Sequence, residues 1–241
     1  MLRCLLVWLV VLPATLFFGT LSLLSSLVDR KGRLAHRCMV SWARMSLWVG
    51  GTTVRVEGLE HVRRDGPQIF ACNHQSMVDI MVLAAHLPVQ FGFVAKAELF
   101  KIPFLGWHMR RAGYIPIVRE NPRLAARTLL DAADKVRAGT NTLIFPEGTR
   151  SPDGMLLPFK IGGFLLASKA GVPIVPIGIA GTRDVVLKKS LRVHKRACAL
   201  VVGEPIPSAG LKGDAREELM ARVRVAIEGC IEHAGKLANP D

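Results

Sequence analysis

Residues 68–95 read QIFACNHQSMVDIMVLAAHLPVQFGFVA, with an apolar run at each end and a polar loop directly after the first run. The runs 68–72 and 91–95 have the length and composition of buried strands. A helix that starts near Ser76 would connect them. A strand, a helix and a second strand in this order are typical of an α/β domain with a largely parallel sheet.

The same alternation continues along the rest of the chain. Short runs rich in β-branched residues are separated by helical windows, as expected for an α/β fold. The predicted strands are 53–57, 68–72, 91–95, 115–118, 142–145, 173–180 and 198–202. We therefore predict the fold class α/β, with a mostly parallel mixed sheet of about seven strands flanked by helices.

Two helical windows carry clear boundary signals. The window 123–138 follows Asn121 and Pro122 and stops at Gly139. The window 215–234 follows Asp214, with Glu217 three residues later, and this spacing is a capping pattern. Apolar residues at helical spacing predict the buried faces, namely Leu124, Leu129, Ala132 and Val136 in the first window and Leu219, Val223, Ile227 and Ile231 in the second.

The N-terminal segment predicts a membrane contact. Residues 4–28 contain no charged side chain, and this run exceeds the ~20 apolar residues that cross a bilayer. Pro13 would kink such a helix, so the segment either spans the bilayer or dips into one leaflet. A cleaved signal peptide is less favoured, because the apolar run is longer than a usual signal core and no A-x-A-like site ends it.

Basic residues flank this segment unevenly. Arg3 alone precedes it, whereas Arg30, Lys31, Arg33, Arg37 and Arg44 follow it. Cytoplasmic flanks carry excess Lys and Arg, so we expect the rest of the chain on the cytoplasmic face, in a bacterium at the inner membrane. Residues 33–49 are either a basic amphipathic helix at a lipid surface or a helix packed on the domain. We divide the chain into membrane-anchoring helices, 1–50, and an α/β domain, 51–241.

The composition narrows the classes of partner. The chain has 32 Lys and Arg against 19 Asp and Glu, a net charge of +13, which favours anionic partners such as lipid headgroups and phosphorylated substrates. One Tyr, no zinc-finger spacing and no aromatic run of the RNA-binding type argue against nucleic acid. The five cysteines lie far apart and no metal-ligand spacing of histidines occurs, so neither disulfides nor a metal site is expected.

The loop after the strand 68–72 carries the first candidate chemistry. In open α/β sheets, ligands bind beyond the carboxyl ends of the strands. If His74 lies in this loop and the helix starts near Ser76, the Asp79 carboxylate can reach back to the imidazole and orient it as a general base. A substrate hydroxyl would then be the nucleophile. The alternative is that Ser76 and Asp79 only cap the helix and His74 is an ordinary loop residue.

Two further strand ends carry candidate residues. After 142–145 the chain reads FPEGTR, residues 145–150, whose carboxylate, glycine, hydroxyl and guanidinium can bind a phosphate and offer backbone N–H groups to an oxyanion. The alternative is a surface turn with an ion pair between Glu147 and Arg150. The stretch GYIPIVR, residues 113–119, ends in Arg119, which by itself is a weak signal.

These blocks together resemble a known family. Four blocks of sequence within about 53–207 are similar, in type and order, to the four blocks of the 1-acyl-sn-glycerol-3-phosphate acyltransferases. They are N-H-x-x-x-x-D, G-x-x-x-x-x-R, F-P-E-G-T-R and V-P-I-V-P-I-G. The resemblance implies that His74 is the general base and Asp79 its orienter. It also implies an acceptor-binding set of Arg119, Glu147, Gly148, Thr149 and Arg150.

The resemblance implies a function as well. An acyltransferase domain, 51–241, would move a fatty acyl group from acyl-CoA or acyl carrier protein to the sn-2 hydroxyl of 1-acylglycerol 3-phosphate (lysophosphatidic acid), giving phosphatidic acid without a cofactor. Anionic membrane lipids are expected partners. Val118 and Pro116 depart from the second block of the family, so another acceptor, such as a lyso-ornithine lipid, stays open. A non-catalytic protein that binds anionic lipid is the alternative of another class.

Overall fold

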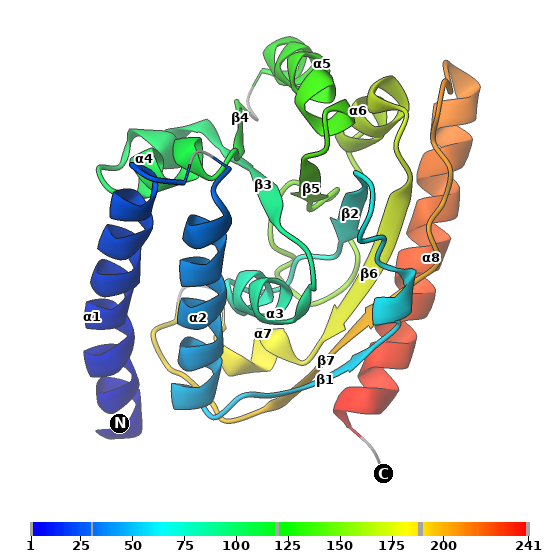
Figure 1. Cartoon of the computed structure of the whole chain (residues 1–241). Coiled ribbons are helices and arrows are strands. Elements are labelled where there is room, and N and C mark those ends of the chain that lie inside the picture. Colours follow the sequence, from blue (N-terminus) through cyan, green and yellow to red (C-terminus); the bar gives the residue numbers. More distant parts are fainter. Residues whose placement is uncertain (1, 30, 119–120, 188–189, 240–241) are drawn as a thin grey trace.

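The computed structural model describes residues 2–29, 31–118, 121–187 and 190–239. Within these residues a seven-stranded sheet forms in the order β1-β7-β6-β2-β5-β3-β4 (Figure 1). The strands are β1 (Thr53–Glu57), β2 (Ile69–Cys72), β3 (Phe91–Lys96), β4 (Ile115–Ile117), β5 (Asn141–Ile144), β6 (Ile174–Ala180) and β7 (Ala197–Val202). Each strand pairs in parallel with the next along the run β6-β2-β5-β3-β4. β7 is antiparallel to β6 and parallel to β1. The predicted fold class is confirmed.

Helices cover both faces of the sheet (Figure 1). The helices are α1 (Leu2–Ser25), α2 (Arg33–Val49), α3 (Val78–His86), α4 (Leu105–Arg111), α5 (Pro122–Arg137), α6 (Gly162–Ala170), α7 (Thr182–Val185) and α8 (Asp214–Ala238), with 3-10 turns η1 (Leu59–His61) and η2 (Ala97–Lys101). Side chains alternate along β2: Phe70 packs with α2 and α3, and Ile69 packs with α5, α6 and α8. Both faces of the sheet are therefore buried, as the apolar strand sequences require.

The starts of the two predicted helices have different outcomes. The Asn121 side chain accepts a hydrogen bond from the Leu124 N–H and begins α5. The predicted cap at Asp214 is wrong, because Gly213 is the capping residue and Asp214 already lies in the first turn of α8. The buried faces largely agree with prediction, although Leu124 is exposed and Ile231 is only half-buried.

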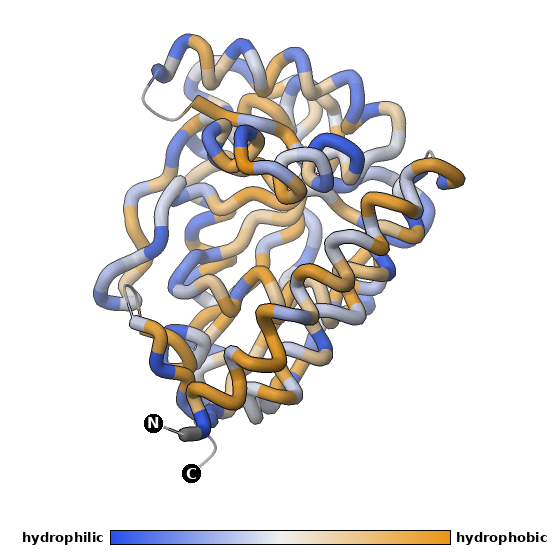
Figure 2. Tube along the Cα trace, turned by 90° about the vertical axis from the view of Figure 1, so that its left-hand side faces the viewer, coloured by the Kyte–Doolittle hydropathy of each residue, from blue (hydrophilic) through white to orange (hydrophobic). Residues whose placement is uncertain are grey.

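α1 has the length and composition to cross a membrane, because the most apolar 18-residue window within residues 3–25 has a mean hydropathy of 2.3, and 17% of this window is buried. Figure 2 views the molecule from this side, and the helix that starts at the N mark is largely hydrophobic. The other face of α1 packs on the molecule along its length. Near one end Trp8 Nε1 donates to the Leu191 carbonyl at 2.8 Å, and near the other Ser22 Oγ lies 2.6 Å from His108 Nδ1.

α2 has a packed face and a basic face. Ala43 and Leu47 enter the core cluster that also contains Phe70 of the sheet. Arg33, Arg37 and Arg44 are exposed, as are Ser41 and Trp48. Residues 33–49 therefore pack on the domain through one face, as one alternative predicts, and their opposite face is basic, whereas contact of this helix with lipid stays a prediction.

Candidate active site

The topology brings three strand ends together. β2 pairs in parallel with β5 on one side and with β6 on the other, so the carboxyl ends of these strands lie at one edge of the sheet. The loop 73–77 follows β2, the turn 145–150 follows β5, and Thr182 follows β6. The two strongest blocks of the sequence therefore meet at this edge, as expected for a ligand site of an open α/β sheet.

His74 and Asp79 are in contact. His74 lies in the loop before α3, and Asp79 lies in the first turn of that helix. His74 Nδ1 is 2.8 Å from Asp79 Oδ2, with side chains 12% and 0% exposed respectively. Because a carboxylate oxygen only accepts, Nδ1 carries the hydrogen and Nε2 keeps a free lone pair. The predicted contact is confirmed, and its geometry suits a general base.

Asp79 also binds the backbone. Its Oδ2 accepts the N–H groups of Gln75 and Ser76 at 2.7 and 2.9 Å, and its Oδ1 accepts the hydroxyl of the buried Thr182. The same carboxylate therefore contacts the imidazole and holds the backbone of Gln75 and Ser76, whereas the capping residue of α3 is Met77, with no side-chain capping bond. These bonds fix the position of Asp79, so the direction of the imidazole is fixed as well.

Phe145 fixes the plane of the imidazole. The rings of His74 and Phe145 are stacked, with centroids 3.9 Å apart and an interplanar angle of 15°. Phe145 follows β5 directly, so its ring reaches the imidazole from the neighbouring strand end. With Asp79 at one edge of the ring and Phe145 on one face, rotation of the imidazole is restricted.

Glu147 fixes the backbone of His74. Its Oε1 accepts the His74 N–H at 2.7 Å, its Oε2 accepts the Leu157 N–H at 2.9 Å, and the residue is 2% exposed. Burial raises the pKa of this carboxyl above its ordinary value. The alternative of a surface turn is wrong for Glu147, since both of its oxygens bind backbone inside the protein.

α8 supports the same loop from the other side. The Arg224 guanidinium donates to the carbonyls of Leu157 and Leu156 at 2.9 and 3.0 Å. It also lies 5.2 Å from the centroid of the Phe159 ring. Arg224 therefore holds in place the segment whose Leu157 N–H binds Glu147. The spacing of residues along α8 gives no signal for this role.

The turn 145–150 presents the remaining predicted residues. Gly148 has φ +71°, a conformation that favours glycine, and a Cβ there would lie 3.0 Å from the Lys160 Cε. Thr149 is exposed and Arg150 is half-buried. The structure thus brings Glu147, Gly148, Thr149 and Arg150 beside His74. Arg119 lies outside the described residues.

Two polar residues of the site were not among the predicted residues. Asn73 is 2% exposed and binds the backbone of Ile179 in β6 twice, through Oδ1 at 2.8 Å and Nδ2 at 2.9 Å. It joins the end of β2 to β6. Thr182, which binds Asp79, follows the predicted strand 173–180, so the strand-end rule could have identified it.

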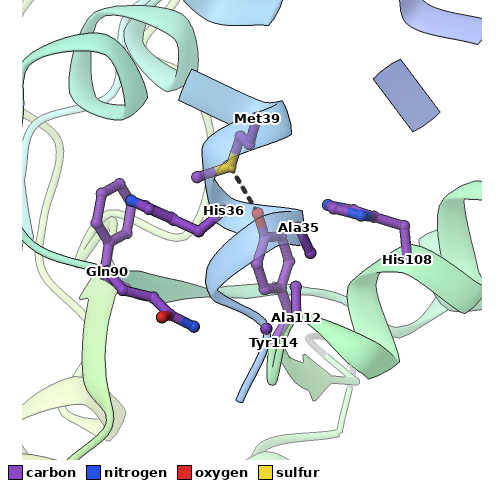
Figure 3. Close-up of a pocket in the computed structure, with 9 residues that line it drawn as sticks. Ala35, His36, Met39, Gln90, His108, Ala112 and Tyr114 are labelled. Carbon is purple, nitrogen blue, oxygen red and sulfur yellow. Dashed lines mark hydrogen bonds between the residues drawn. The ribbon is translucent and has the colours of Figure 1, made fainter. Parts of the chain in front are cut away.

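A small cavity of about 10 Å³ lies apart from these strand ends, between α2, β3 and α4 (Figure 3). It has room for about one water molecule. His36, Met39, His108 and Tyr114 line it, and the Tyr114 hydroxyl donates to Met39 Sδ at 3.0 Å. Burial lowers the pKa of His36 and of His108.

Comparisons with known proteins identify relatives of this chain. A family model described as acyltransferase matches residues 53–180. A 1-acyl-sn-glycerol-3-phosphate acyltransferase of Saccharomyces cerevisiae is 33% identical, covering 91% of this chain and 73% of its own. A chloroplastic protein of that name from Brassica napus is 40% identical over 65% of this chain.

The likeness extends to a solved structure. The crystal structure of the 1-acyl-sn-glycerophosphate acyltransferase of Thermotoga maritima superposes with a TM-score of 0.83 at 30% identity, covering 96% of this chain and 94% of that one. The chain spans only part of some curated relatives, 45% of the Brassica napus protein and 58% of one from Chlamydomonas reinhardtii.

Proposed function

Since this chain belongs to the acyltransferase family, we propose that it transfers a fatty acyl group from a thioester to the sn-2 hydroxyl of 1-acylglycerol 3-phosphate, giving phosphatidic acid. The observation that carries this proposal is the His74 imidazole, held by the buried Asp79 with Nε2 free, beside the turn 145–150. The names of the yeast and Thermotoga relatives support the acceptor.

His74 is the general base in this proposal. Its Nε2 takes the proton of the acceptor hydroxyl while the hydroxyl oxygen attacks the thioester carbonyl carbon. The tetrahedral intermediate collapses, the carbon–sulfur bond breaks, and the leaving sulfur takes the proton from His74. Asp79 keeps the Nδ1 hydrogen bond throughout and stabilises the imidazolium between these steps.

The turn 145–150 and Arg119 bind the acceptor phosphate in this proposal. Guanidinium groups and backbone N–H groups are suited to phosphate oxygens, which supports Arg119, Arg150, Thr149 and Gly148 in this role. Glu147 supports acceptor binding indirectly, because its oxygens hold His74 and Leu157. The donor is acyl-CoA or acyl carrier protein.

We place α1 in a single leaflet of the membrane, on the cytoplasmic side. α1 packs against the molecule near both of its ends, through Trp8 and Ser22, so a spanning orientation would draw the domain itself into the bilayer. Lying along the leaflet, α1 keeps its exposed apolar face in lipid. The basic residues after it, such as Arg33 and Arg37, support the cytoplasmic side.

Release of free thiol from acyl-CoA, with and without lysophosphatidic acid, tests the proposed function. His74→Ala should lower the rate by roughly 10²- to 10⁴-fold, the usual contribution of a positioned general base. His61→Ala is the matched control, because His61 Nδ1 contacts the Val202 carbonyl away from the site. Wild-type turnover by His74→Ala would refute the mechanism.

A panel of acceptors separates the remaining alternatives. Faster transfer to lyso-ornithine lipid than to lysophosphatidic acid would identify another acceptor for the same chemistry. Vesicle binding without any thiol release would identify a lipid-binding protein without catalysis. Acyl carrier protein in place of coenzyme A, in the same assay, identifies the donor.

A further inference from the structure

The segment between β3 and β4 carries an apolar surface that no part of the described chain covers. We call residues 97–111, which comprise η2 and α4, the α4 segment. Phe100 and Met109 of this segment are buried, whereas its other large apolar residues are 38–55% exposed, namely Leu99, Ile102, Phe104, Leu105 and Trp107. Exposed apolar side chains gathered in one short segment are typical of an interaction site.

The α4 segment is a folded element with internal hydrogen bonds. The Gly106 N–H donates to the Ile102 carbonyl at 2.8 Å, and Arg110 Nη2 donates to the Phe100 carbonyl at 2.7 Å. A Cβ at Gly106 would lie 2.1 Å from that same Phe100 oxygen, so the glycine allows η2 and α4 to approach closely. The apolar side chains are therefore presented from a fixed backbone.

Phe104 is held in a costly conformation at the tip of this segment. Its φ is +62° and its ψ −60°, and the Leu105 N–H donates to the Pro103 carbonyl at 2.7 Å across it. This is a strained turn for a residue other than glycine. The ring is 55% exposed and lies 5.5 Å from the Trp107 ring.

The α4 segment adjoins the apolar face of α1. His108 is bonded to Ser22 as described above, and Arg111 Nη1 donates to Ser26 Oγ at 3.2 Å. Figure 1 shows α4 beside the end of α1 that these residues occupy. The exposed side chains of α1 near this end include Phe17 and Leu24, at 63% and 57%. The α4 segment and α1 are thus in direct contact, and each carries exposed apolar side chains.

The charges around the α4 segment match an anionic partner. Lys101, Arg110 and Arg111 are exposed, and the one acidic residue in the sequence of the segment, Glu98, has its carboxylate 3.7 Å from the Lys96 ammonium group. Exposed aromatic rings beside Lys and Arg are the composition of elements that lie at the boundary between headgroups and acyl chains. A water-soluble partner would not explain why this exposed apolar segment touches α1, whose own apolar side chains are exposed.

We infer that the α4 segment is a second membrane-insertion element, which enters the headgroup boundary of an anionic leaflet beside α1. The inference rests on the membrane contact proposed for α1, and it is independent of the catalytic chemistry. The segment follows β3, whose carboxyl end lies at the same edge of the sheet as those of β2 and β5. Two supports, α1 and the α4 segment, thus hold the edge with His74 at the lipid surface.

Trp107 fluorescence tests this inference. In a chain with Trp8, Trp42 and Trp48 changed to Phe, bound to vesicles of phosphatidylcholine and phosphatidylglycerol, Trp107 emission should shift to shorter wavelength. Quenching by iodide should be lost, and lipids brominated on the upper acyl chain should quench the emission. Equal iodide quenching of free and vesicle-bound protein would overturn the inference.

Val225 supplies the matched control. It is 67% exposed on α8, and moving the sole Trp there should leave the emission open to iodide on vesicles. Two single variants of the otherwise unchanged chain, Phe104→Asp and Val225→Asp, are then compared on the same vesicles. Phe104→Asp should partition about tenfold or more weakly than Val225→Asp, because it loses one aromatic ring buried in lipid. Equal partitioning of these two folded variants, checked by thermal unfolding, would also overturn the inference.

Discussion

Replacing Asp79 with Asn tests the coupling between the carboxylate and the imidazole. The amide oxygen can take the place of Oδ2 and accept from the His74 ring and from the N–H groups of Gln75 and Ser76. The amide nitrogen then faces the Thr182 hydroxyl, which can accept from it. The hydrogen bonds therefore survive in Asp79→Asn, and the change removes the negative charge.

The loss of charge sets the expected magnitude. When His74 takes a proton, its Nδ1 lies 2.8 Å from a carboxylate in the wild type and would face a neutral amide in the variant. Two unit charges about 4 Å apart interact by about 4 kcal/mol at an effective dielectric constant near 20. Allowing for the neutral hydrogen bond that remains, about 3 kcal/mol is lost, so kcat should fall on the order of 10²-fold.

Initial rates of thiol release at saturating acyl-CoA and lysophosphatidic acid measure this effect. KM for the acceptor should stay within about twofold, because the charge acts on the protonated imidazole rather than on the bound acceptor. Asp29→Asn is the control, since Asp29 accepts the backbone N–H groups of Lys31 and of Leu34 in the first turn of α2, far along the chain from His74. Wild-type kcat in Asp79→Asn would refute the reasoning.

Three further predictions concern stability. Burial raises the pKa of the Glu147 carboxyl. The contribution of this carboxyl to stability therefore declines as pH rises from 4.5, its ordinary pKa, through the raised pKa. Glu147→Gln should remove this decline, as measured by denaturant unfolding. Burial lowers the pKa of His36. Stability is therefore lost as pH falls from 6.5, the ordinary pKa of histidine, through the lowered pKa. The Tm of His36→Phe should depend less on pH over this range than the Tm of the wild type. Gly178→Ala should lower Tm, since its Cβ would lie 2.3 Å from the α8 backbone; Gly229→Ala, with open space around it, should not.

The strands could be predicted because each is a local apolar run. Predicted strand 53–57 coincides with β1, and the other six differ from the observed bounds by one residue at one or both ends. The order of the strands could not be predicted in this way. β7 lies between β6 and β1, antiparallel to β6 and parallel to β1, a long-range arrangement that no local run of residues encodes.

The same distinction applies to the candidate site. His74 and Asp79 are five residues apart, so the start of α3 alone determines their contact. Asn73 and Ile179 are 106 residues apart, and Asp79 and Thr182 are 103 apart. These partners depend on the neighbouring positions of β2 and β6, which become known only with the sheet order.

Glu147 shows why a motif does not reveal the task of each of its residues. A carboxylate at a strand end could contact a substrate or fix a loop, and the sequence is the same in both cases. Here Oε1 binds the His74 N–H, and the Ser151 N–H donates to the His74 carbonyl at 2.8 Å. Both backbone groups of His74 are thus held by the segment after β5. The F-P-E-G-T-R block therefore fixes the position of His74, the proposed general base, and a lower kcat in Glu147→Gln needs no contact between Glu147 and the acceptor.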